Sequence, residues 1–255
     1  MSDADSPVRF ETLTDLGDTS PTLVEGLPGH GLVASITVDQ LNDQLGLEHH
    51  GNIISEEFPP VASFKDGRVR DMVRVYAGQN PDILTLQSDL ALPPEAFRPL
   101  SETILHDLAS EFDRAIFLAG APAANEEQIG EVTGVATTAD LETELTEAGV
   151  ELAEGNGLVG GITGSLVNSC YHNDVPAVVL VVRSHPYLPD PAAARSVIEN
   201  ALEPLVGFDI DTTELEEQSD RIRRRMQQIA EQFQALQEQQ GGQQPKQSPT
   251  PSMYQ

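Results

Sequence analysis

The last three residues of the chain, Met253, Tyr254 and Gln255, combine chemical groups that suit molecular recognition. They place an apolar side chain, an amphipathic ring and a free carboxylate next to one another. Residues 241–252 before them are rich in Gly, Gln, Pro and Ser, and too poor in apolar groups to offset the entropy of ordering. We therefore expect a disordered tail over 241–255 whose tip binds a basic pocket on a partner. The competing interpretation is a frayed terminus without a role.

Residues that could support nucleophilic or metal chemistry do not form a recognisable motif. The sequence has no Gly-x-Ser-x-Gly nucleophile turn. Cys170 and His172 are two residues apart, so on a helix their side chains would point to different sides. His49 and His50 have no third ligand at a metal-binding spacing, which favours a solvated loop. We predict neither a catalytic cysteine nor a metal site.

Four polar residues fall near the ends of predicted strands, where α/β proteins often place a site: Glu25, His30, Asp89 and His185. Nothing in their spacing shows that they converge, and a buried or capping role is favoured for each. The sequence thus predicts no catalytic constellation.

Two glycine-rich segments could bind a phosphate group. Gly155-x-Gly157-x-x-Gly160 matches the dinucleotide fingerprint formally, but a polar segment precedes it where a buried strand is required. Gly29-His30-Gly31 could hold an anion at a helix N-terminus. Close helix–sheet packing and a tight strand-to-helix turn explain the two segments better. There is also no Walker lysine motif, so we predict no cofactor and no nucleotide-driven motor.

The charge of the chain restricts its partners. The 255 residues include 41 acidic and 14 basic side chains, giving a formal net charge of −27. Such a chain repels nucleic acid and anionic lipid, so we expect neither as a partner. Acid-rich, lysine-poor surfaces suit high ionic strength, which indicates a halophilic source. The acidic N-terminus does not resemble a signal peptide, and the longest apolar run, Ala177–Val182, cannot span a bilayer, so we expect a cytoplasmic protein.

Short apolar runs alternate with helical patterns along most of the chain. This alternation predicts an α/β domain over residues 20–210, with helices on both faces of a mainly parallel central sheet. Asp66-Gly67 predicts a hairpin between Val61–Lys65 and Arg68–Tyr76. Residues 1–19 are expected to be a flexible segment. The predicted strands are Thr22–Glu25, Ile83–Leu86, Ala115–Ala119 and Ala177–Val182.

A heptad pattern marks residues 211–240 as a separate C-terminal helix. Its apolar positions are Leu215, Ile222, Met226, Ile229, Phe233 and Leu236. The helix could lie on its own domain or pair with the same helix of another subunit, and the sequence leaves both open.

Four segments together resemble the proteasome assembly chaperone 2 family over about residues 20–235. They are Val24–Val33, Glu57–Pro60, Gly160–Gly164 and His185–Ala194. The first contains the signature turn with Gly26, Pro28, Gly29 and Gly31. The resemblance implies a three-layer α/β fold similar to that of nucleoside phosphorylases and hydrolases, and homo-oligomers in archaea.

The same resemblance implies a function at the proteasome. Some archaeal members look like ATP-independent activators or assembly factors that dock a hydrophobic–tyrosine–any-residue tail into pockets of the core particle α-ring. Met253, Tyr254 and Gln255 match that pattern here. The rival interpretation is a small-molecule enzyme, ligase- or nucleosidase-like, that uses the cleft of the α/β fold.

Overall fold

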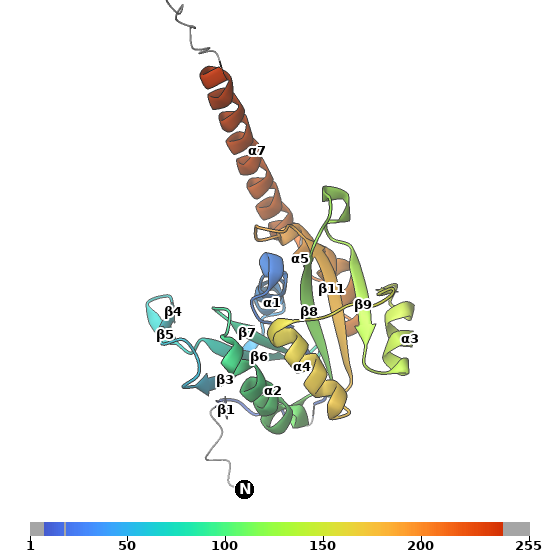
Figure 1. Cartoon of the computed structure of the whole chain (residues 1–255). Coiled ribbons are helices and arrows are strands. Elements are labelled where there is room, and N and C mark those ends of the chain that lie inside the picture. The colour runs from blue at the N-terminus through green and yellow to red at the C-terminus, as the bar shows by residue number, and fades with distance from the viewer. Residues whose placement is uncertain (1–7, 18, 242–255) are drawn as a thin grey trace, which may run out of the picture. The chain divides into compact units, whose positions relative to one another are not determined.

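The structure, a computed structural model, describes residues 8–17 and 19–241 (Figure 1). In the last helix, side chains are described as far as Met226 and at Gln228. The chain divides into two compact units, Met1–Glu216 and Glu217–Gln255. This division lies close to the start expected for the C-terminal helix.

The first unit is built on a nine-stranded sheet in the order β1-β3-β6-β7-β2-β8-β11-β9-β10. Its centre, β7-β2-β8-β11, is parallel, whereas β1, β3 and β6 on one side and β9 on the other pair antiparallel to their inner neighbours. The strands are β1 Val8–Thr12, β2 Thr22–Gly26, β3 Glu48–Ser55, β6 Val73–Gly78, β7 Ile83–Ser88, β8 Arg114–Pro122, β9 Val132–Ala136, β10 Glu151–Leu152 and β11 Ala177–Ser184.

Helices cover both faces of this sheet, which confirms the predicted α/β class (Figure 1). Helices α2 and α4 pack on one face, and α1, α3 and α5 pack on the other. The helices are α1 Val33–Gln44, α2 Phe97–Thr103, α3 Ala139–Glu147, α4 Gly161–His172, α5 Pro191–Val197, α6 Glu203–Val206 and α7 Thr213–Gly241. Single π-helical turns extend α2 over Ile104–Leu108 and join α5 to α6 over Ile198–Leu202.

Two hydrophobic cores result, because successive side chains of a strand point to opposite faces. On β8, Ala115 and Phe117 belong to the core under α2 and α4, whereas Ile116 and Leu118 belong to the core under α1 and α5. The central strands are apolar on both faces, as buried parallel strands require. This pattern made them recognisable in the sequence.

Two expectations about strands need correction. The segment 1–19 is not flexible throughout, because Val8–Thr12 forms β1, pairs with β3 and buries Val8 completely. The predicted hairpin exists, but its second arm is divided. Strands β4 Ser63–Lys65 and β5 Arg68–Arg70 form a separate ribbon, and β6 then begins in the main sheet. Tertiary pairing decides both cases, since neither segment has a strong pattern of its own.

Candidate functional site

The signature turn after β2 holds the first helix against the centre of the sheet. A Cβ atom on Gly26 would lie 2.5 Å from the Cβ of Val38, so only glycine permits this approach of α1 to β2. Gly31 has a left-handed φ of 64°, and a Cβ there would lie 2.6 Å from Ser184 Oγ. Gly29 has open space around it. Gly26 and Gly31 therefore fix the turn by close packing and backbone conformation.

Glu25 is buried at the carboxyl end of β2, immediately before this turn. Its Oε1 accepts a hydrogen bond from the Leu27 amide at 2.7 Å, and its Oε2 accepts one from Thr163 Oγ1 at 3.3 Å. Burial raises the pKa of the Glu25 carboxyl to about 8, although these bonds and one from the Leu118 backbone act in the opposite direction. The raised pKa favours the neutral form of the Glu25 carboxyl at pH 7.

Ser184 and His30 lie at the same edge of the sheet. Within the described residues, Ser184 Oγ and His30 Nε2 are buried without a hydrogen-bond partner. Close by, Asp190 caps α5 by accepting from the Ala193 amide, and it also accepts from the His185 amide at 2.7 Å. The Asp190 amide donates to the carbonyl of Gly31, so it ties the β11–α5 loop to the signature turn.

The sheet keeps these groups from forming one catalytic site. Val24 points to the face covered by α1 and α5, so the next residue, Glu25, points to the other face. There its hydrogen-bond partner Thr163 comes from α4. Ser184 is two residues after Val182, so it points to the opposite face, covered by α1 and α5. Glu25 and Ser184 therefore lie at the same edge of the sheet but on opposite faces, and they do not come together in one site.

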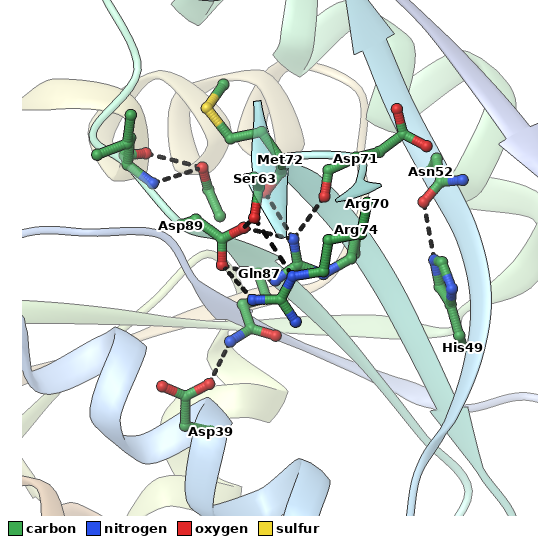
Figure 2. A network of polar contacts seen from close by, with 12 residues as sticks. Asp39, His49, Asn52, Ser63, Arg70, Asp71, Met72, Arg74, Gln87 and Asp89 are labelled. Atoms are coloured by element: carbon green, nitrogen blue, oxygen red, sulfur yellow. Dashed lines mark hydrogen bonds and ion pairs between the residues drawn. The ribbon is translucent and has the colours of Figure 1, made fainter. Parts of the chain in front are cut away.

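Asp89 belongs to a separate polar network after β7 (Figure 2). Its carboxylate binds the two terminal guanidinium nitrogens of Arg74 at 2.7 and 2.8 Å and one of Arg70 at 2.8 Å. It also accepts from the hydroxyl of Ser63. Burial alone would raise the Asp89 pKa, but the bonds from Arg74 and Ser63 and both positive charges lower it. The network joins the β4–β5 ribbon to the main sheet.

The pair His49-His50 is not in a solvated loop, which corrects that expectation. Both residues lie on β3. His50 is buried, and its Nε2 lies 2.7 Å from Glu111 Oε2, while Thr14 Oγ1 lies 3.2 Å from its Nδ1. His49 contacts Asn52 Oδ1 at 2.8 Å. Among the described residues, no three His, Cys, Asp or Glu side chains are placed to hold a metal ion.

The glycines of the fingerprint-like segment do not pack against the sheet as predicted. Cβ atoms on Gly155, Gly157 or Gly160 would meet nothing within 4 Å. They belong to an exposed loop beside β10. The glycine that packs closely is Gly164 in α4, where an added Cβ would lie 2.2 Å from the carbonyl oxygen of Val159. The helix that follows is thus preceded by an open loop, not by the strand that nucleotide binding requires.

The cysteine and the C-terminal helix have defined environments. Cys170 is buried, which raises its thiol pKa to about 12 and makes it a poor nucleophile, while His172 is exposed at the end of α4. In α7, Leu215 is buried in the core of the first unit, Ile222 is half-buried and Met226 is 43% exposed. The side chains of Ile229, Phe233 and Leu236, and the residues Met253, Tyr254 and Gln255, lie outside the described part of the chain.

Comparison with known proteins confirms the family suggested by the sequence motifs. The sequence profile described as the PAC2 family matches residues 23–230. The uncharacterized protein MJ0106 of Methanocaldococcus jannaschii is 26% identical over 226 residues, 88% of this chain and 92% of that protein.

Solved structures share the fold. Pyrococcus furiosus PbaA, described as an archaeal homolog of proteasome-assembly chaperone, has a TM-score of 0.80 at 24% identity over 92% of this chain and 96% of its own. Pyrococcus furiosus PbaB, described as an archaeal proteasome activator, has a TM-score of 0.79 at 20% identity over 88% and 99%. No helix in the described ranges has the length and apolarity to cross a membrane.

Proposed function

The chain belongs to the PAC2 family, and from this premise we propose that it is an ATP-independent activator or assembly chaperone of the proteasome core particle. The observation that carries the proposal is the ending Met253-Tyr254-Gln255 on a chain that shares its fold with an archaeal proteasome activator. In this proposal the protein acts in the cytoplasm, where it meets the core particle.

Each residue of the ending has a role in the proposed docking. The Gln255 carboxylate pairs with a basic residue in a pocket between two α-subunits. Met253 fills an apolar cleft beside it, and the Tyr254 ring presses on the α-subunit segment that holds the gate. A three-residue contact is weak, so docking depends on several tails acting together through a homo-oligomer. The heptad positions of α7 after Leu215 are candidates for contacts between subunits, since Leu215 is buried in its own domain.

The proposed activity needs no catalytic residue and no cofactor. Since the sequence has no Walker lysine motif, the activator would open the gate without unfolding folded proteins. Activation should therefore favour short peptides and chains that are already unfolded.

Hydrolysis of a fluorogenic peptide by the matching core particle, in the salt that keeps both proteins folded, tests the proposal. The full chain is compared with a form lacking residues 253–255 and with Tyr254→Ala. Tyr187→Ala is the matched control, because it removes the ring of an exposed tyrosine that lies far from the tail in sequence. We expect stimulation that both tail variants abolish and the control retains.

A pull-down of the core particle from the same samples separates the two proposed activities. Tail-dependent binding without stimulation identifies an assembly role. If neither binding nor stimulation depends on the tail, the proposal is wrong.

A small-molecule enzyme is the alternative, and the neutral acid Glu25 at the carboxyl edge of the sheet is the observation in its favour. Glu25 and Ser184 are both fully buried and lie on opposite faces of the sheet, so one substrate could not reach both. An enzyme would also keep its activity without residues 253–255, whereas an adaptor would lose its partner.

A further inference from the structure

The β4–β5 ribbon exposes apolar side chains on an ordered arm. Asp66 and Gly67 both have left-handed φ values, 52° and 77°, as a tight two-residue hairpin turn requires. Phe64 and Val69 are direct cross-strand partners, so they lie on one face of the ribbon. Their exposed fractions are 71% and 78%. A ribbon of two three-residue strands gains little from such side chains unless another surface covers them.

The base of the ribbon is held in place. Ser63 and Arg70 are the innermost residues of β4 and β5, and both bind the carboxylate of Asp89 (Figure 2). Asp89 in turn binds Arg74, which is buried in the main sheet. An arm fixed in this way loses little conformational entropy when it binds, which favours association.

The opposite face of the ribbon carries two cations. Lys65 and Arg68 are direct cross-strand partners at the turn, and like charges in that position repel each other. Neither forms an ion pair with any other described residue. In a chain with 41 acidic and 14 basic side chains, two adjacent cations without a partner indicate an anionic surface as the binding partner.

A surface of complementary character lies at the other end of the sheet. An open groove of about 1160 Å³ runs between β9, β10 and the loop 153–159. Among its apolar groups, Leu152, Val135 and the fully exposed Leu158 are the large ones that are exposed. Glu151 and Glu154 supply negative charge on the same segment, while the Arg183 guanidinium on the far wall donates to the Pro122 carbonyl. β10 pairs only with β9 in the described sheet, so its outer edge can accept another strand.

We propose that the β4–β5 ribbon of one copy of this chain inserts into the β9–β10 groove of a second copy. Phe64 and Val69 would cover the apolar groups of the groove, and the long side chains of Lys65 and Arg68, which flank the turn, would extend past it to Glu151 and Glu154. The inference rests on the homo-oligomer of the proposed function and assigns its subunit contacts to the ribbon and the groove, in place of α7.

The two surfaces of one chain cannot meet each other. The ribbon connects β3 to β6, and six strand spacings separate β6 from β10 in the sheet order. At roughly 4.8 Å per spacing, this is about 29 Å. The contact is therefore between copies, and it joins different surfaces of the two partners. Repetition of such a head-to-tail contact closes a ring when the rotation between copies permits it.

Charge reversal tests the pairing on the full-length chain. One variant carries Lys65→Glu and Arg68→Glu, a second carries Glu151→Lys and Glu154→Lys, and a third combines all four. The mass of each is measured by light scattering after gel filtration, at the lowest salt in which circular dichroism shows a folded protein. We expect the first two variants to dissociate into monomers and the combined variant to regain the wild-type mass.

Matched controls keep the test specific to these surfaces. Arg9→Glu with Arg98→Glu repeats the charge change of the first variant at exposed sites outside both surfaces, and Glu95→Lys with Glu102→Lys repeats that of the second. The proposal would be overturned if the wild type were monomeric, or if the ribbon variant or the groove variant kept the wild-type mass. It would also be overturned if the combined variant did not regain that mass. Loss of mass in the controls would also overturn it, since charge alone would then explain the effect.

Disulfide trapping gives a second, independent measurement. The single native cysteine, Cys170, is buried, so cysteines introduced at the surface are the reactive ones. A chain with Val69→Cys and Leu158→Cys should form a ladder of cross-linked species on mild oxidation, whereas neither single variant should cross-link. Cross-linking by Val69→Cys alone indicates a two-fold contact and contradicts the pairing. These readouts do not involve the proteasome, so an oligomer that fails to stimulate the core particle would refute the proposed function only.

Discussion

Replacing Glu25 by glutamine should change how the stability of this protein depends on pH. Glu25 is buried at the end of β2, and its pKa is raised from 4.5 to about 8, with desolvation as the largest cause. Glutamine has nearly the same shape, and its carbonyl oxygen can accept the hydrogen bond that the Leu27 amide gives to Glu25. The variant therefore removes the titration and keeps the packing.

The size and sign of the effect follow from proton linkage. Below pH 4.5 the folded and unfolded chains both hold the proton, and between pH 4.5 and 8 only the folded chain does. The unfolded chain binds fewer protons in this window, so each pH unit lowers the free energy of unfolding by about 1.4 kcal/mol. Over the whole window the loss is on the order of 5 kcal/mol, and it levels off above pH 8.

Denaturant unfolding of both proteins at pH 5, 6, 7 and 8, in one salt concentration, measures this difference. We expect wild type and Glu25→Gln to be close at pH 5, and the variant to be more stable by about 4 kcal/mol at pH 8. Taking the difference between the two proteins cancels the other titrating groups. Glu95→Gln, an exposed control, should follow the wild-type profile. Parallel profiles for wild type and Glu25→Gln would refute the reasoning, because Glu25 would then titrate alike in both states.

Two further substitutions test the packing of the signature turn and the Asp89 network. Gly26→Ala should destabilise the fold by about 2 kcal/mol, because its Cβ would lie 2.5 Å from Val38, whereas Gly29→Ala should have little effect. Equal melting temperatures for these two variants would contradict the assignment. Asp89→Ala should cost about 3 kcal/mol in denaturant unfolding, because it leaves the buried Arg74 guanidinium without its counter-charge. The double variant with Arg74→Met should recover part of this loss, and failure to recover any would show that the charge is not the cause.

The central sheet was predictable because its signal is local. On β8 and β11, four or more consecutive apolar residues bounded by turn signals predict a strand buried on both faces, and the structure places alternate side chains in the two cores. The Asp66-Gly67 turn was equally clear, because few dipeptides adopt two left-handed residues in succession. The beginning of helix α3 shows the usual limit of such reasoning. By residue type Asp140 is also a favoured capping residue, but Thr138 accepts the capping hydrogen bond from the Leu141 amide.

Polar and edge segments could not be predicted in this way. Strand β1 is defined by its pairing with β3, and β3 by its pairing with β1 and β6. His50 on β3 is buried, and Glu111 and Thr14 supply its hydrogen bonds from distant parts of the chain. The sequence also showed Glu25, His30, Asp89 and His185 near strand ends, without showing which face of the sheet each occupies. That depends on the register of each strand and on which helix covers it.

The sequence by itself determined the family, the fold class and the ending on which the proposed function rests, because motifs, periodicity and the last three residues are properties of the chain. Only the tertiary structure decided that Glu25 and Ser184 lie on opposite faces of the sheet, and that an apolar, cationic ribbon and an acidic groove lie at its two ends. The physical reason is that burial, pKa and surface complementarity depend on residues brought together from far apart in the chain, and spacing along the sequence does not encode those distances.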